Sequence, residues 1–233
     1  MIDLRRSADR PTTRIPWLES RHSFSFGRHH DPANTHHGLL LVSNDDVVSA
    51  GTGFETHPHR DMEIVTWVLG GSLVHQDSTG HSGVIYPGLA QRMSAGRGIW
   101  HSEMNASRGD DVHFVQMWVP PDTESVDPGY EQLDVNDQLD AGGLVTVASG
   151  RKEDGAIFIH QLGASLHVGR LRAGETVAVP EANHAHVFVA VGSADLEGAG
   201  PLATGDAARL TGAGSPSLTA GPDGAEVLIW ATS

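Results

Sequence analysis

Short stretches rich in valine, isoleucine, phenylalanine and tryptophan recur along the whole chain, and glycine or proline flanks most of them. No window longer than ten residues carries apolar residues at the 3.6-residue spacing of an amphipathic helix. With 28 glycines and 12 prolines among 233 residues, turns are plentiful enough to join many short strands. The sequence therefore predicts an all-β fold. The predicted strands are 38–42, 63–69, 72–76, 112–119, 144–148, 156–160, 165–171, 176–179, 187–191 and 226–231. A single helical turn is the most that we expect at 207–210.

An acidic stretch near the middle of the chain predicts a boundary between two β units. Residues 120–140, PPDTESVDPGYEQLDVNDQLD, contain seven acidic residues, no basic residue and three prolines. This composition is typical of a solvated linker, and an ordinary exposed loop would give the same boundary. We therefore expect an N-terminal unit at 1–120, an acidic linker at 121–141 and a C-terminal unit at 142–233.

The two halves contain similar hairpin patterns, EIVTWVLGGSL at 63–73 and HVFVAVGSADL at 186–196. Two copies of one β-barrel unit explain this similarity economically, and chance resemblance between two hairpins is the alternative.

Composition excludes several classes of function. The chain has no cysteine, which excludes disulfides, thiolate metal sites and a cysteine nucleophile. Its formal net charge of −14 argues against direct binding of nucleic acid. No apolar run approaches the length of a membrane span, and the start, MIDLRRSADRP, lacks the apolar segment of a secretory signal. We expect a cytoplasmic protein without membrane contact.

The segment GTGFETHPHRDMEIVTWVLGG has the spacing Gly-x5-His-x-His-x3-Glu-x6-Gly, from Gly51 to Gly70. Residues i and i+2 of a strand point to the same face, so His57 and His59 are expected to project together, and Glu63 has the same parity. Two neutral imidazoles and a carboxylate with open coordination positions suit Fe(II) or another divalent transition metal.

A second segment, SAGRGIWHSEMN, follows about forty residues later and places His101 and Glu103 at i and i+2. Its spacing predicts a strand that pairs with the first, which would bring three histidines and one or two carboxylates together. The residues alone leave open whether Glu103 or Glu63 is the fourth ligand. If Glu63 is not a ligand, we expect it to lie behind the ligands and hold an imidazole in one tautomer.

The C-terminal half is expected to bind no metal. NHAHVF supplies His184 and His186, but His186 is only six positions before Gly192, whereas His59 is eleven positions before Gly70. No histidine follows His186 to act as a third ligand.

The sequences of these motifs resemble those of the pirin family, within the cupin superfamily. The resemblance is carried by WLESRHSFSFGRHHDP (17–32), SNDDVVSAGTGFETHPHRDMEIVTWVLGGSLVHQDS (43–78) and MSAGRGIWHSE (93–103). It is dense over residues 1–120 and thin beyond them. Gly96-Arg97-Gly98 replaces the Pro-x-Gly of the general cupin pattern, as in pirin-like proteins.

The resemblance implies a bicupin, that is, two cupin-type β-barrels packed together. Because the C-terminal half lacks the metal motif, we expect its cupin to be degenerate. Mapped by motif, it implies metal ligands at His57, His59, His101 and Glu103, and so favours Glu103 as the fourth. We expect one divalent metal, with Fe(II) preferred and Mn, Ni, Cu or Zn compatible with these donors. The glycine-rich GTG and GRG segments lack phosphate-loop context, so we expect no nucleotide cofactor.

Members of the family are associated with quercetin 2,3-dioxygenase activity. The resemblance thus implies an oxidoreductase that opens a flavonol ring with O2, with a small aromatic substrate and O2 as its partners. Glu103 would act as the catalytic base that accepts the proton of the flavonol 3-hydroxyl.

Two alternatives remain, and the resemblance to the pirin family also implies the first of them. The first is an iron-dependent, redox-sensing protein that regulates transcription through a protein partner, and the second is a cupin enzyme with a different substrate. A bicupin can satisfy its own barrel packing, so we expect a monomer.

Overall fold

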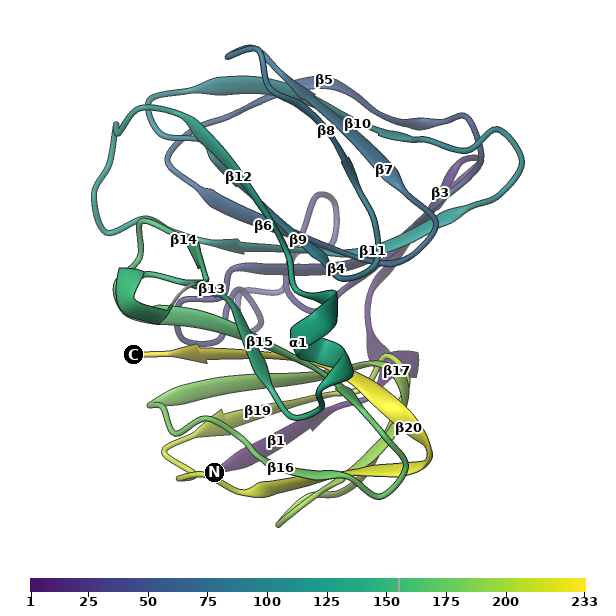
Figure 1. Cartoon of the computed structure of the whole chain (residues 1–233), viewed down its shortest axis with the longest axis vertical. Coiled ribbons are helices and arrows are strands. Elements are labelled where there is room, and N and C mark those ends of the chain that lie inside the picture. The colour runs from purple at the N-terminus through teal and green to yellow at the C-terminus, as the bar shows by residue number, and fades with distance from the viewer. Residues whose placement is uncertain (155) are drawn as a thin grey trace.

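The computed structural model describes residues 1–154 and 156–233. Over these residues the regular secondary structure is almost entirely β-strand, in three sheets, as predicted (Figure 1). The helical segments among them are α1 (Asn136–Asp140) and two 3-10 turns, η1 (Ser7–Asp9) and η2 (Lys152–Asp154). In this part of the chain no helix has the length and apolar character needed to span a membrane.

The N-terminal half is a barrel made of a seven-stranded and a four-stranded sheet, drawn in the upper part of Figure 1. The seven-stranded sheet has the order β12-β9-β6-β11-β4-β3-β2, and the other has the order β5-β10-β7-β8. The larger sheet comprises β2 (Thr12–Ile15), β3 (Leu18–His22), β4 (Val42–Val48), β6 (Glu63–Gly70), β9 (Leu89–Ser94), β11 (Val112–Val119) and β12 (Gly129–Asp134). The smaller sheet comprises β5 (Gly53–His59), β7 (Leu73–Asp77), β8 (Ser82–Ile85) and β10 (Ile99–Asn105).

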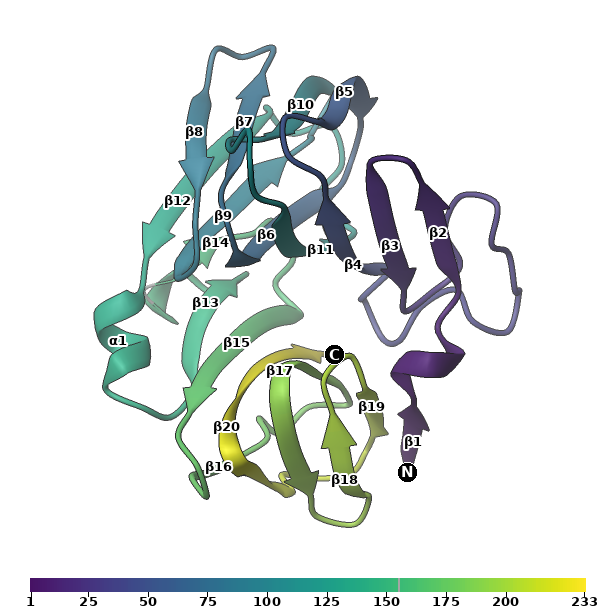
Figure 2. The same cartoon turned by 90° about the vertical axis from the view of Figure 1, so that its right-hand side faces the viewer.

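The C-terminal half is one nine-stranded sheet that curls around its own core, as Figure 2 shows. Register shifts in the pairing of β17 with β20 accompany this curvature, as β-bulges do. The sheet comprises β1 (Ile2–Arg5), β13 (Val145–Ser149), β14 (Ile157–Phe158), β15 (Ala164–Leu171), β16 (Thr176–Ala178), β17 (His184–Leu196), β18 (Gly200–Ala203), β19 (Ala207–Thr211) and β20 (Ser217–Thr232). Two barrels of this kind form the bicupin fold.

The two halves share a hydrophobic core, to which the N-terminal half contributes Trp67 and Met117 and the C-terminal half Phe188 and Trp230. A hydrogen bond from Trp67 Nε1 to Glu226 Oε1, 2.6 Å long, also joins them. The first strand crosses between the halves, because β1 pairs with β19. The chain therefore folds as two barrels that share one hydrophobic cluster where they meet.

Three expectations from the sequence need correction. Residues 207–210 form the strand β19 rather than a helical turn, because pairing with β17 and β1 outweighs their helical propensity. Of the strand expected at 38–42, only the last residue, Val42, lies in a strand, and it is the first residue of β4. The segment 121–141 is more than a solvated linker, since it contains α1 and also β12, which pairs with β9. The domain boundaries at 120 and 142 stay a prediction.

Candidate metal centre

The pairing of β5 with β10 builds the candidate site. The two strands are antiparallel, and His57 lies directly opposite His101, which confirms the strand pairing expected from the two motifs. Phe54 lies opposite Glu103, so β5 has one more residue than β10 between these two pairs. Such a β-bulge re-aims the side chains of the bulged strand.

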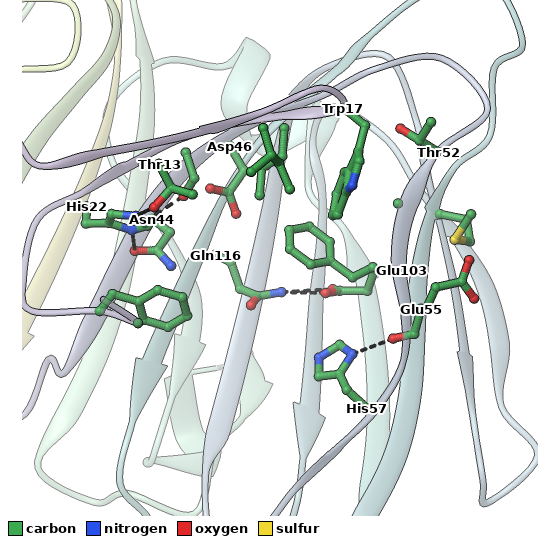
Figure 3. Close-up of a pocket in the computed structure, with 18 of the residues that line it drawn as sticks. Thr13, Trp17, His22, Asn44, Asp46, Thr52, Glu55, His57, Glu103 and Gln116 are labelled. Atoms are coloured by element: carbon green, nitrogen blue, oxygen red, sulfur yellow. Dashed lines mark hydrogen bonds between the residues drawn. The ribbon is translucent and has the colours of Figure 1, made fainter. Parts of the chain in front are cut away.

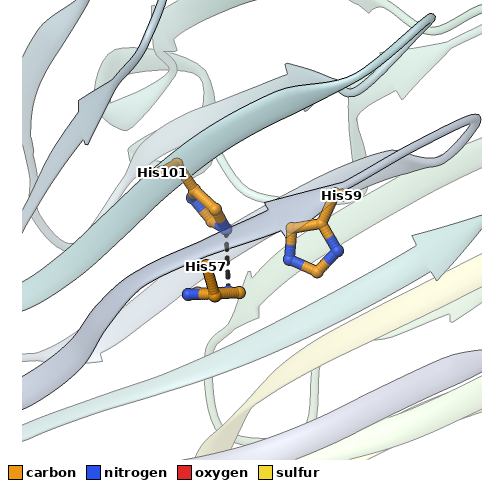
Figure 4. Close-up of side chains that lie close together, drawn as sticks. All are labelled: His57, His59 and His101. Atoms are coloured by element: carbon orange, nitrogen blue, oxygen red, sulfur yellow. Dashed lines mark hydrogen bonds between the residues drawn. The ribbon is translucent and has the colours of Figure 1, made fainter.

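The side chains of His57, His59 and His101 converge on one point (Figure 4). One nitrogen from each ring lies within 4.8 Å of a nitrogen from both others. Nε2 of His57 and Nε2 of His101 are 3.1 Å apart. His101 is buried, and the other two are half-buried. The structure therefore brings together the three histidines named from the sequence.

The electrostatics of the His59 and His101 rings favour their neutral forms. Burial, together with the neighbouring His57 and His75, lowers the pKa of His101 to about 3. Burial, together with His101 and His57, lowers the pKa of His59 to about 4. Neutral imidazole is the form that binds a metal ion.

Two observations test whether these residues fit a metal ion. Nε2 of His59 is buried and has no hydrogen-bond partner among the described residues, which is costly for a polar atom unless a ligand satisfies it. Nδ1 of His57 lies 2.8 Å from the carbonyl oxygen of Glu55. The carbonyl can only accept, so His57 donates from Nδ1 and its Nε2 lone pair is free. The donor set fits a transition metal.

Glu103 lies beside the three histidines and is held from the opposite sheet. It is buried, and both of its carboxylate oxygens accept hydrogen bonds from Nε2 of Gln116, at 2.9 and 2.8 Å. Gln116 is in turn held by Trp118, whose Nε1 donates to its amide oxygen at 3.1 Å. Among the described residues, the set of close donor atoms that includes Glu103 is His75–His101–Glu103. Its role as fourth ligand is taken up below as a proposal.

Glu63 contacts a different histidine from those expected. Its buried carboxylate accepts a 2.7 Å hydrogen bond from Ser94 Oγ, and it lies 3.3 Å from Nδ1 of His160. The parity argument fails because β5 ends at His59 and a turn intervenes, with Asp61 at φ 45°. Glu63 therefore begins a strand of the opposite sheet, and its contacts do not hold any of the three converging imidazoles in place.

A cavity of about 900 Å³ opens in front of the site (Figure 3). Its residues include His57, His59 and Glu103. Its apolar wall comprises Ile15, Trp17, Leu18, Phe26, Phe54 and Trp118, and its polar wall includes Thr13, Asn44, Asp46 and Gln116. Cavities of this size accommodate drug-sized organic molecules.

Two buried residues next to the site, His75 and Asp77 on β7, were absent from the sequence analysis. The side chains of both are fully buried, and Nε2 of His75 lies 3.1 Å from Oδ2 of Asp77. The available signal was the His-x-Asp alternation in VHQD (74–77), at the end of a strand predicted at 72–76. The sequence did not indicate which face of that strand is buried.

The C-terminal histidines lie away from this site. His186 on β17 is buried against Phe24, with ring centroids 5.7 Å apart, and burial holds its pKa well below the ordinary value. Nε2 of His186 and Nδ1 of His184 lack a hydrogen-bond partner among the described residues.

Comparison with known sequences places the chain in a family. Residues 4–119 match the family described as Pirin, and residues 146–230 match the Quercetinase C-terminal cupin domain. A Mycobacterium tuberculosis protein is 60% identical over 230 residues, 98% of this chain and 94% of that one. This chain belongs to the pirin family. The mycobacterial relative is provisionally named a quercetin 2,3-dioxygenase. The Escherichia coli K12 protein named quercetin 2,3-dioxygenase is 44% identical over 69% of this chain and 68% of that one.

Solved structures agree with this placement in the pirin family. The crystal structure of YhhW from Escherichia coli superposes with a TM-score of 0.92 at 35% identity, covering 100% of this chain and 98% of that one. The structure of the bacterial pirin YhhW in complex with nickel(II) gives a TM-score of 0.90 at 35% identity, over 99% and 98% of the two chains. The predicted family and fold are confirmed. A transition metal is thus bound in a relative of the same fold.

Proposed function

We propose that this pirin is a metal-dependent dioxygenase that opens the ring of a flavonol such as quercetin with O2. The observation that carries the proposal is the convergence of three imidazoles on the wall of a cavity large enough for a flat aromatic substrate. The name of the Escherichia coli relative supports the substrate class.

His57, His59 and His101 would hold the metal, with Glu103 as the fourth ligand. A divalent ion held there would supply Lewis acidity toward an ionised flavonol hydroxyl and the means to react it with O2. The chain's own groups prepare this chemistry. His57 keeps its Nε2 lone pair free by donating from Nδ1 to the Glu55 carbonyl.

Glu103 is the group that we propose accepts the proton of the flavonol 3-hydroxyl. It borders the cavity, and Gln116 holds both carboxylate oxygens from the opposite sheet. A base oriented in this way needs little reorganisation when the proton is transferred. Trp118 supports the same geometry through Gln116.

The aromatic wall of the cavity would position the substrate and exclude water. Trp17 and Phe54 pack edge to face, with ring centroids 5.2 Å apart, and Phe26 packs against Trp118 at 5.7 Å. Aromatic rings bury large areas of a flat ligand and favour offset or edge contacts with it. A site from which water is excluded also protects a reactive, electron-rich enolate from side reactions.

The proposal is tested by oxygen uptake with quercetin. The metal-free protein is reconstituted anaerobically with Fe(II) and, separately, with Mn(II), Ni(II), Cu(II) or Zn(II). We expect quercetin-dependent uptake with at least one metal, and its loss in His101→Ala and Glu103→Gln. His36→Ala, an exposed loop histidine, is the matched control and should retain activity.

Metal binding at these residues without uptake for any metal would overturn the dioxygenase assignment. That result would favour a different substrate or the redox-sensing role with a protein partner.

A further inference from the structure

The buried pair formed by His75 and Asp77 lies behind His101, on the neighbouring strand of the four-stranded sheet. In the pairing of β10 with β7, Asp77 lies opposite His101 and His75 lies opposite Glu103. Nδ1 of His75 lies 3.5 Å from Nδ1 of His101. An uninterrupted chain of contacts thus runs from Asp77 through His75 to the back of His101.

The two carboxylate oxygens of Asp77 have different partners. Oδ1 accepts from the backbone N–H of Thr79 at 2.8 Å, from the Thr79 hydroxyl at 2.6 Å and from the backbone N–H of His81 at 3.2 Å. Oδ2 faces Nε2 of His75. Burial alone would raise the pKa of Asp77, but the hydrogen bonds from Thr79, His75 and His81 outweigh it and lower the pKa.

The hydrogen-bond directions follow from this arrangement. An ionised carboxylate only accepts, so His75 donates from Nε2. In the neutral form of His75 this is the single N–H of the ring, so its Nδ1 is a lone pair, and it faces Nδ1 of His101. His101 must then donate from Nδ1, which leaves its Nε2 as a lone pair. That Nε2 is the atom 3.1 Å from Nε2 of His57.

We propose that Asp77 and His75 are positioning residues that fix the tautomer of His101, so that its Nε2 lone pair faces the point where the three imidazoles converge. A partner behind a ligating histidine commonly fixes its tautomer and ring orientation. This site uses two residues in series for that purpose. The inference rests on the proposed metal site, but its tautomer prediction concerns the metal-free protein.

Tyr130 restricts the orientation of His75. The two rings stack with centroids 4.7 Å apart and an interplanar angle of 27°. Tyr130 lies on β12, within the acidic segment, and also stacks on His81 at 5.5 Å. A stacked ring cannot tilt away from both of its hydrogen-bond partners without losing this contact, so the direction of the chain of contacts is preserved.

Asp77→Asn is the decisive variant because it keeps the shape of the side chain and replaces the acceptor that faces His75 with a donor. The amide oxygen must take the Oδ1 position, where two backbone N–H groups point. The amide NH2 then faces Nε2 of His75, which must accept. His75 becomes the Nδ1–H tautomer, and its N–H now faces His101 Nδ1. His101 would have to carry its proton on Nε2, where it blocks metal binding.

Two measurements are made on this variant. The ¹⁵N chemical shifts of the metal-free protein should show Nε2–H on His75 and Nδ1–H on His101 in wild type, and both exchanged in Asp77→Asn. The affinity for Ni(II), measured by competition with a chelator, should fall about 10- to 100-fold. Asp111→Asn removes the same charge at an exposed position and is the matched control, with no expected change in either measurement.

His75→Gln provides a rescue. Its amide can donate to Asp77 and accept from His101, so it should retain more Ni(II) affinity than His75→Phe, which keeps the stacked ring and removes both hydrogen bonds. The melting temperature of each metal-free variant is also measured, to distinguish a lower Ni(II) affinity from a loss of folded protein.

Three results would overturn the inference. They are a wild-type ¹⁵N pattern with Nε2–H on His101, an unchanged Ni(II) affinity in Asp77→Asn, and full affinity in His57→Ala. The last would place the ion among His75, His101 and Glu103 instead. Failure of quercetin turnover alone, with the tautomers and affinities as expected, would overturn the proposed function and leave this inference standing.

Discussion

Asp46 gives the protein a pH-dependent stability that can be worked out from its surroundings. It lies on β4 in the wall of the cavity, 4% exposed, and its Oδ1 has no hydrogen-bond partner among the described residues. Burial raises its pKa to about 7, and the nearby Asp45 and Glu103 act in the same direction. Contact with Ser20 opposes the rise only in part. In the unfolded chain this carboxyl has its ordinary pKa of 3.8.

The direction of the effect follows from proton binding. Between about pH 4 and pH 7 the folded protein holds a proton on Asp46 that the unfolded chain releases, so the free energy of unfolding falls as the pH rises. A pKa difference of about three units corresponds to about 4 kcal/mol in total, of which about 3 kcal/mol falls between pH 5 and pH 8. Asp46→Asn is neutral at every pH and should lack this loss.

The assay is unfolding by guanidinium chloride at pH 5 and pH 8 on metal-free protein. The difference in free energy of unfolding, Asp46→Asn minus wild type, should increase by about 3 kcal/mol from pH 5 to pH 8. Asp111→Asn, an exposed carboxyl, is the control and should follow the wild type. If the free energy of unfolding changed equally between pH 5 and pH 8 in wild type and in Asp46→Asn, the reasoning would be refuted.

Three further predictions concern the metal centre and the contact between the halves. His59→Ala should lose the metal with little change in fold, and His186→Ala should keep it; metal stoichiometry by elemental analysis checks both. With pKa values of about 4 and 3, His59 and His101 should take up protons only in that range. NMR titration of the metal-free protein would contradict this if both midpoints lay near 6.5. Trp67→Phe leaves Glu226 without its 2.6 Å donor and should lower the free energy of unfolding by about 1–3 kcal/mol, measured by denaturant titration.

The three converging histidines could be found from the sequence because their signal is local. His57 and His59 share a face of one strand whatever the rest of the fold does, and the second motif supplies its own partner strand. The strand at 112–119 was predicted at its true bounds for the same reason, since its run of valine and aromatic residues is a local strand signal.

What the sequence could not supply depends on contacts between distant segments. The donors around Asp77 become significant only once β7 is placed behind β10. The parity of Glu63 with His59 was misleading, because a turn between them moves the chain from one sheet to the other. Residues 207–210 lack a strand signal in the sequence. They form a strand because they pair with β1 on one side and with β17 on the other.

The strand β11 explains how the C-terminal barrel contributes to a site that it does not line. Its residues alternate between two surroundings, as strand geometry requires. Gln116 faces the cavity and holds Glu103. Its neighbour Met117 belongs to the core between the halves, where its sulfur accepts a hydrogen bond from Trp230 Nε1 at 3.1 Å. Because interiors are closely packed, the position of Met117 is fixed by the C-terminal half. The same packing therefore fixes Gln116 and, through it, the carboxylate that we propose as the base.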